Sequence, residues 1–291
     1  MKVPSSASTS PSMIVFDKDG TLGNCTQSLY VWVERMADSI VTELIKNGMR
    51  NQSHKEHLLS IFYSAVGFDS ANNKLVDSSE CILSSGTWQQ VLEVTISCIR
   101  DYIPNAHEKV THWHETMGDI HAKDEPLVSN LEALMNCLKA QGFTIAICTS
   151  DDRKATNFCM KNWNIAHLVD YSICGDEVKE AKPSSYPLQQ LCQIANVSAD
   201  QCVVVGDTSA DVGMGLNGNA GLVIGVLTGS STADYLLDAG ADLVIPNVCY
   251  LPRILGGSRL RRGGSDLTKD TSSMKSHSSS DSLVSDDGRG P

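Results

Sequence analysis

Two aspartates stand one residue apart at residues 17 and 19, directly after the apolar run at 13–16. The stretch reads MIVFDKDGTLGNC, so a glycine and a threonine follow the two acids. In an extended segment alternate side chains point to the same side, which would place Asp17 and Asp19 together and turn Lys18 away. Two adjacent carboxylates can bind a hard metal ion or exchange protons with a substrate.

Further polar side chains stand at or near other short apolar runs. They are Thr149 and Ser150 after the run at 143–148, Lys182 before Pro183, and Asp207 with Asp211 after the run at 202–205. If these runs are parallel strands, ligands bind where their carboxyl ends meet. Carboxylates that converge there repel each other by about 4 kcal/mol per pair at about 4 Å and an effective dielectric of about 20. A cation must therefore lie among them, and Mg²⁺ suits oxygen ligands that also receive a phosphate.

Other interpretations of the same residues are less complete. An EF-hand loop needs an acid or Asn at its fifth position, Gly at its sixth and Glu at its twelfth. Thr21, Leu22 and Ser28 stand there instead. The aspartate pair could also lie in an ordinary turn, and the residues G-D-T-S-A-D at 206–211 could simply cap a helix. The order of acids, hydroxyl and lysine along the chain favours a catalytic site.

The segments that must position these residues show two patterns of apolar side chains. Residues 28–125 have apolar side chains at helical spacing, as at 29–45, 88–102 and 110–117. From 126 onward, short apolar runs alternate with helical patterns; the runs are 143–148, 171–174, 202–205, 222–226 and 242–245. Strands that are apolar throughout predict a parallel sheet covered by helices on both faces, and residues 13–16 supply its first strand.

We therefore predict an α/β fold, with a doubly wound parallel sheet and an inserted α-helical cap. The expected ranges are a disordered lead at 1–12, a core at 13–27 and 126–256, a cap at 28–125 and a disordered Ser/Gly-rich tail at 257–291. The tail has few large apolar residues to offset the entropy of ordering.

Composition limits the function classes. A formal net charge of −11 argues against a nucleic-acid surface, and 41% hydrophobic residues fit a globular protein with a core. No apolar stretch approaches the roughly 18 residues of a membrane span.

Ten scattered cysteines form no C-x-x-C pair and indicate reduced thiols in a cytoplasmic protein. The Ser-rich start leaves organelle targeting open. We expect a monomer or homodimer, and the sequence identifies no partner for the tail.

Four motifs together resemble the haloacid dehalogenase (HAD) superfamily of phosphohydrolases. They are F-D-K-D-G-T-L at 16–22, the strand ending in Thr149, the pair Lys182-Pro183, and G-D-T-S-A-D at 206–211. The residues GLVIGVLTG at 221–229 are similar to the phosphoglycolate-phosphatase branch. The chain departs from that branch at Ser185, where proline is frequent, and in the acidic pair Asp151-Asp152 after Ser150. The resemblance spans 13 to about 250 and implies a HAD-like, Rossmannoid core with a helical cap.

The resemblance also implies a role for each candidate residue. Asp17 is the nucleophile that forms an aspartyl-phosphate, and Asp19 is the acid and base, with a pKa raised by the neighbouring acids. Thr149 donates a hydrogen bond to the phosphoryl oxygens, Ser150 contacts substrate, and Lys182 offsets negative charge. The Mg²⁺ site combines Asp207 with Asp17 and the backbone carbonyl of Asp19. Asp211 either binds the ion directly or contacts one of the groups that bind it.

The predicted function is Mg²⁺-dependent hydrolysis of a small phosphorylated metabolite, such as a phosphoglycolate-like compound or a sugar phosphate. A dehalogenase displaces halide without needing a proton, so the second acid, Asp19, favours phosphate-ester chemistry. Two alternatives remain open at this point. One is a phosphomutase, in which the aspartyl-phosphate passes to a sugar hydroxyl. The other is a non-catalytic sensor or scaffold that uses the Ser-rich tail, although it would not require both Asp17 and Asp19.

Overall fold

The computed structural model describes residues 11–76, 81–117, 120–121 and 124–260. Its main sheet has six strands, and all five adjacent pairs are parallel. In the order β10-β9-β8-β1-β6-β7 they are Leu243–Ile245, Leu222–Val226, Cys202–Gly206, Met13–Phe16, Thr144–Cys148 and Tyr171–Ile173. Every apolar run that predicted a strand forms one. The structure thereby confirms the predicted doubly wound α/β fold class.

Helices cover both faces of this sheet because its strands are apolar on both sides. Ile14 and Phe16 of β1 pack with α6 (Leu131–Ala140), α7 (Arg153–Asn162) and α11 (Leu251–Leu260). Met13 and Val15 face the opposite side, against α8 (Tyr186–Ala195) and α9 (Ser209–Asn217). The short helix α10 (Ala233–Asp238) extends that second layer over β9. Burying one such side chain contributes roughly 1.5–3 kcal/mol, so the central strand is firmly fixed.

The register of the central strands aligns the carboxyl ends of β1, β6 and β8, so the loops that follow these three strands lie side by side. Phe16, the last residue of β1, lies opposite Ile147 of β6 on one side and Val205 of β8 on the other. The chain leaves β1 toward β6, and it returns through β8 on the other side. Loops on either side of such a switch point diverge and leave a crevice at the carboxyl ends of the strands.

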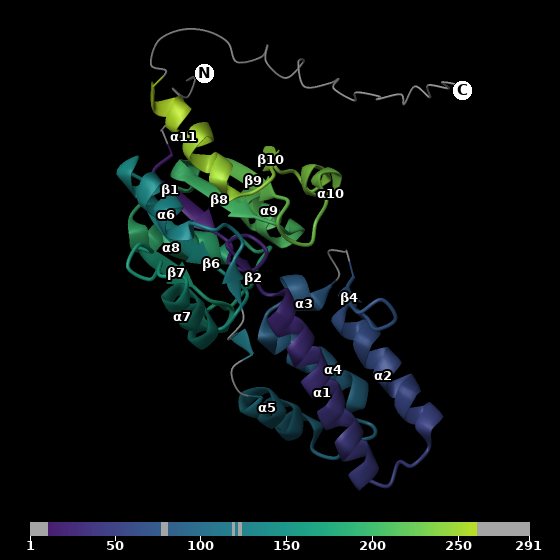
Figure 1. The fold of residues 1–291 in the computed structure, drawn as a ribbon. Coiled ribbons are helices and arrows are strands. Elements are labelled where there is room, and N and C mark those ends of the chain that lie inside the picture. The colour runs from purple at the N-terminus through teal and green to yellow at the C-terminus, as the bar shows by residue number, and fades with distance from the viewer. Residues whose placement is uncertain (1–10, 77–80, 118–119, 122–123, 261–291) are drawn as a thin grey trace, which may run out of the picture.

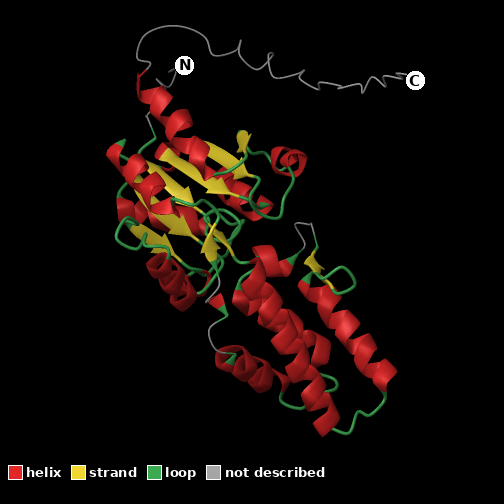
Figure 2. Ribbon diagram, viewed as in Figure 1, coloured by secondary structure: helices red, strands yellow, loops and turns green. Residues whose placement is uncertain are grey.

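The cap forms a second lobe with its own apolar core, as Figures 1 and 2 show. Its helices are α1 (Thr26–Lys46), α2 (Gln52–Val66), α3 (Ile82–Ser85), α4 (Trp88–Ile99) and α5 (Ala106–Thr116). A small hairpin, β3 (Phe68–Asp69) with β4 (Lys74–Leu75), follows α2. At the base of the cap, β2 (Gly23–Asn24) pairs antiparallel with β5 (Glu125–Pro126), so the entering and leaving chains lie side by side.

Short 3₁₀ turns at Gly175–Glu177, Ala199–Gln201 and Val248–Tyr250 complete the described elements. Helix α11 continues to Leu260, so the tail boundary predicted after residue 256 falls inside a helix. Residues 1–10 and 261–291 lie outside the described part of the chain, and the predicted disorder of lead and tail stays a prediction for them. Within the described residues, none of the helices has the length and apolar character required to cross a membrane.

Candidate active site

The turn after β1 is shaped to hold an acid from β8. Gly20 has φ +81°, a conformation that side chains disfavour, and an added Cβ there would lie 2.5 Å from Asp207 Oδ2. The neighbouring Thr21 hydroxyl donates to Asp207 Oδ1 at 3.1 Å. From the loop after β9, the backbone N–H of Ser230 donates to Asp207 Oδ2 at 3.1 Å. The glycine and threonine of the first motif therefore serve to place Asp207.

Lys182 joins the first and last motifs through its buried ammonium. Its Nζ lies 2.6 Å from Asp17 Oδ1 and 2.7 Å from Asp211 Oδ1, and it also donates to the backbone carbonyl of Cys148 at 3.2 Å. Burial opposes the charged form, but Asp17 and Asp211 outweigh it and raise the pKa of Lys182 well above its ordinary value. Lys182 is therefore a permanent cation at the carboxyl end of β1.

Three buried carboxylates converge beside this lysine, and Asp17 and Asp211 contact it. Ligand oxygens of Asp17, Asp207 and Asp211 all lie within 4.8 Å of one another. Burial, together with Asp211 and against Lys182, raises the pKa of Asp17 to about 7. Burial and the Asp17 charge raise the pKa of Asp207 well above its ordinary value. One ammonium does not balance three acids, and their hard oxygen donors fit Mg²⁺.

Asp211 has a second task besides facing this cluster. Its Oδ2 accepts hydrogen bonds from the backbone N–H of Thr208 at 3.1 Å and from the Thr208 hydroxyl at 2.6 Å. The first of these contacts, together with the Asp211 N–H that donates to Thr208 Oγ1 at 3.4 Å, forms the capping box that begins α9. Because Oδ1 binds Lys182 as well, Asp211 fixes the lysine against the sheet edge.

The expectation that Lys18 points away from the aspartates is wrong. Lys18 is fully buried, and its Nζ lies 2.6 Å from Asp19 Oδ1 and 2.9 Å from Asp151 Oδ2. The reason is local: the N–H of Leu22 donates to the Lys18 carbonyl, so the chain turns and strand alternation ends. The Asp19 side chain is thus paired with Lys18, outside the three-carboxylate cluster.

The pKa of Asp19 lies above its ordinary value, the direction that a proton donor requires. Burial is the main cause and Asp151 adds to it, while Lys18 acts in the opposite direction. The raised pKa expected from neighbouring acids is therefore present, but desolvation contributes more than they do.

The two hydroxyl residues after β6 face different partners. Thr149 extends β6 because its N–H donates to the carbonyl of Ile173, and its Oγ1 accepts from the Asp151 N–H at 3.1 Å. The Thr149 hydroxyl proton then remains for donation to a bound anion. Ser150 Oγ instead donates to the backbone carbonyl of Ser85, in cap helix α3, at 3.2 Å.

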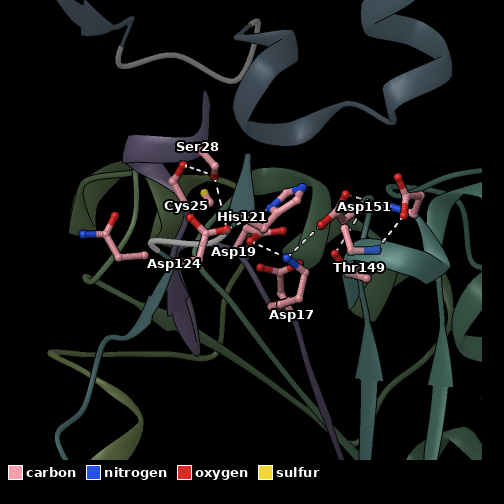
Figure 3. Close-up of polar contacts among 12 residues, drawn as sticks. Asp17, Asp19, Cys25, Ser28, His121, Asp124, Thr149 and Asp151 are labelled. Atoms are coloured by element: carbon pink, nitrogen blue, oxygen red, sulfur yellow. Dashed lines mark hydrogen bonds and ion pairs between the residues drawn. The ribbon is translucent and has the colours of Figure 1, made fainter. Parts of the chain in front are cut away.

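A cavity between core and cap brings most of these residues together. Five of the predicted catalytic and metal-binding residues line it from the core side, namely Asp17, Asp19, Thr149, Lys182 and Asp211, and Ser150 lines it beside them. Asp207 lies outside this lining and borders an adjacent cavity with Gly20. Figure 3 shows Asp17, Asp19 and Thr149 gathered above the ends of the central strands. This gathering is the geometry expected at a switch point.

The cap and the chain that leaves it supply side chains that sequence reasoning did not identify. Ser84, Ser85 and Trp88 line the cavity from the cap, and His121 lines it from the segment before β5. The Nδ1 of His121 lies 2.8 Å from Asp124 Oδ2, and this contact raises the pKa of His121 although burial acts against it. No spacing in the sequence marks these residues, because two cap helices, α3 and α4, and the segment before β5 bring them together.

Comparison with known proteins places these features in a family. The family model for haloacid dehalogenase-like hydrolases matches residues 11–219. A plasmid-encoded phosphoglycolate phosphatase of Cupriavidus necator is 24% identical over 156 residues, which cover 54% of this chain and 67% of that protein. A pyrophosphatase, PpaX, of Bacillus mycoides is 24% identical over 238 residues, covering 79% of this chain and 94% of that protein.

Solved structures share the fold at lower identity. A predicted phosphoglycolate phosphatase from Haemophilus somnus superimposes with a TM-score of 0.59 at 18% identity, over 84% of this chain and 98% of that one. A putative β-phosphoglucomutase from Thermotoga maritima gives a TM-score of 0.56 at 15% identity, over 84% and 99% of the two chains. At such identities the likeness concerns the architecture of core and cap.

Proposed function

Because the chain belongs to the haloacid dehalogenase-like hydrolase family, we propose that it hydrolyses a small phosphorylated metabolite with Mg²⁺, through an aspartyl-phosphate on Asp17. The protein is a phosphoric monoester hydrolase. The observation that carries the finer proposal is the placement of Asp17 beside Lys182, with Asp207 and Asp211 converging on the same point. A nucleophile, a fixed cation and a cluster of metal-binding oxygens then share one sheet edge.

In the first step, a carboxylate oxygen of Asp17 attacks phosphorus, and the bond from phosphorus to the ester oxygen breaks. Asp19 gives its proton to the departing alkoxide. The Lys182 ammonium and the Thr149 hydroxyl stabilise charge on the phosphoryl oxygens. Mg²⁺ held by Asp17, Asp207 and the backbone carbonyl of Asp19, with Asp211 beside them, would supply the positive charge that lets a phosphate dianion approach.

In the second step, water attacks the same phosphorus and releases Asp17 as a carboxylate. Asp19, which has just lost its proton, accepts one from that water, so the acid is restored for the next turnover. The burial that raises the pKa of Asp19 serves both steps, because a carboxyl that titrates closer to neutral pH can both give and take a proton.

The cavity and the relatives support a proposal for the substrate class. Cap residues Ser84 and Ser85 line the cavity, and their hydroxyl oxygens, which donate to the Cys81 carbonyl, can accept hydrogen bonds from a small hydroxylated leaving group. Two of the similar proteins are named phosphoglycolate phosphatase and pyrophosphatase. We place phosphoglycolate-like compounds and sugar phosphates first among the substrates to be screened.

Hydrolysis in heavy-oxygen water tests this mechanism. Attack at phosphorus in the second step should give inorganic phosphate with one solvent oxygen per turnover and an alcohol without label. Accumulation of a phosphorylated isomer in place of free phosphate would support the phosphomutase. Label in the alcohol would mean attack at carbon and would refute the aspartyl-phosphate.

We also propose a reducing, cytoplasmic setting. All ten cysteines are free thiols in the structure, and several lie buried in the core. Reduced cysteines are typical of that compartment. Fractionation of cells that produce the native protein tests the proposal, and recovery in an oxidising compartment would contradict it.

A further inference from the structure

A chain of polar contacts runs from the cap to Asp19. The indole Nε1–H of Trp88, at the start of cap helix α4, donates to Asp151 Oδ1 at 2.7 Å. The other carboxylate oxygen of Asp151 forms an ion pair with Lys18 Nζ at 2.9 Å, and Lys18 donates in turn to Asp19 Oδ1 at 2.6 Å. Figure 3 shows Asp19 and Asp151 close together near the carboxyl ends of the strands.

We propose that Lys18 and Asp151 are positioning residues for Asp19, and that the Trp88 indole makes this arrangement depend on a seated cap. The inference rests on the proposed function, which gives Asp19 the role of acid and base. Lys18 holds Oδ1 of Asp19, so proton exchange with the substrate falls to Oδ2. The cap would then set the rate of proton transfer as well as enclose the cavity.

The burial of Lys18 argues for such a role. Its side chain has no exposed surface, and it lies between one candidate catalytic acid and one acid that is tied to the cap. A buried ion pair is a weak source of stability, because removing two charges from water costs about as much as their attraction returns. An apolar side chain could fill the same volume. Orientation of Asp19 gives the buried lysine a function that packing does not.

The charge balance explains why the cap contact matters. While Asp19 keeps its proton, Lys18 balances the charge of Asp151. Once Asp19 has given that proton away, Lys18 faces two carboxylates, and the group of Lys18, Asp19 and Asp151 has a shortage of positive charge. Two donors stabilise Asp151: the backbone N–H of Asp152 at 2.8 Å and the Trp88 indole. Burial raises the pKa of Asp151, but Lys18, His121 and the Asp152 N–H together outweigh it and lower that pKa. Loss of the indole would leave Asp151 to compete more strongly with Asp19 for the Lys18 ammonium.

Substrates with different leaving groups test the proposal. Trp88→Phe keeps an aromatic side chain but replaces the indole by a smaller phenyl ring without the Nε1–H, and we expect kcat/KM for an alkyl ester such as glycerol 2-phosphate to fall about 10- to 100-fold. For p-nitrophenyl phosphate, whose leaving group needs no proton, the loss should stay within about threefold. Trp113→Phe is the matched control, because Trp113 packs against the cap core from helix α5 and does not line the cavity. This control should lower kcat/KM for the two esters equally and only slightly.

A second variant gives the same test nearer to Asp19. Lys18→Met should also lower kcat/KM for the alkyl ester more than for p-nitrophenyl phosphate. In the double variant, Lys18→Met should add less than about threefold to the loss of kcat/KM that Asp19→Asn causes alone. A direct substrate contact by Trp88 would instead raise KM, by similar factors for both esters. Equal losses on the two esters, or additive losses in the double variant, would overturn the proposal.

The result for Asp19→Asn separates this inference from the proposed function. If Asp19→Asn is selective for leaving group but Trp88→Phe and Lys18→Met are not, only the coupling to the cap is wrong. If Asp19→Asn itself shows no leaving-group selectivity, its role as an acid fails, and the coupling fails with it. Thermal unfolding of each variant identifies any that lose activity merely by failing to fold.

Discussion

The Lys182 ammonium lies 2.6 Å from Asp17 Oδ1, although 165 positions separate the two residues in the chain. Asp17 belongs to the turn after the first strand, and Lys182 stands at the cis peptide bond to Pro183, ahead of α8. The contact holds the nucleophile Asp17 in place, because the lysine is itself fixed by its second ion pair, with Asp211.

Replacing Asp17 with Asn should reduce kcat by about a thousandfold or more, because the amide keeps the shape but loses the nucleophilic oxygen charge. Steady-state assays measure this, and circular dichroism verifies the fold. Asp238→Asn, on the exposed end of α10, is the control for a change of one charge. Full activity in a folded Asp17→Asn variant would contradict covalent catalysis.

The stability of the metal-free protein should fall as pH rises from about 4 to about 7. Burial raises the pKa of Asp17 from 3.8 to about 7, so in this window the folded protein keeps a proton that the unfolded chain has released. The loss is at most about 4 kcal/mol from this group. The free energy of unfolding, measured at several pH values in the presence of a chelator, tests this. Asp17→Asn should have a shallower slope, and identical slopes would show that Asp17 does not titrate in this window.

Chelation should stop turnover, and added Mg²⁺ should restore it, because Asp17, Asp207 and Asp211 repel a phosphate dianion. Mg²⁺ should also raise the unfolding temperature, since it binds only the folded cluster. The stabilisation provides a readout independent of activity. Undiminished activity after complete metal removal would refute the metal site.

Gly229→Ala should weaken Mg²⁺ activation. An added Cβ would lie 1.8 Å from Asp207 Oδ2, which forces this carboxylate or the loop after β9 to move. We expect about 1–3 kcal/mol of destabilisation from overpacking, and a higher Mg²⁺ concentration for half-maximal rate. Gly256→Ala, in helix α11, is the control, because the atom nearest to its added Cβ would be Gln141 Nε2 at 3.3 Å. An unchanged Mg²⁺ curve in Gly229→Ala would show that the cradle around Asp207 is not needed.

Deletion of residues 261–291 should leave the phosphatase rate unchanged within about twofold. The last buried leucines of α11, Leu251 and Leu255, precede this segment and stay in the core. Activity and unfolding temperature of the shortened chain measure the effect. A large loss in either would show that the segment contributes to the folded enzyme.

The sequence by itself determined the six strands, their parallel class and the candidates for chemistry. Strands buried on both faces must be apolar throughout, and this local pattern is readable wherever the fold places them. Asp17, Thr149 and Asp207 were predicted from their positions after such strands, and strand register then brings those positions level. Signals of this kind are strong because each depends on residues that are neighbours in the chain.

Only the tertiary structure decided which partner each side chain meets. Lys18 was expected to point away, but its side chain is buried against Asp151, which follows the distant strand β6. Trp88, Ser85 and His121 reach the cavity from segments whose packing depends on the whole cap. The physical reason is that such contacts join residues far apart in the chain. Their geometry is fixed by how a sheet edge and a helical lobe pack together, and no local spacing records that.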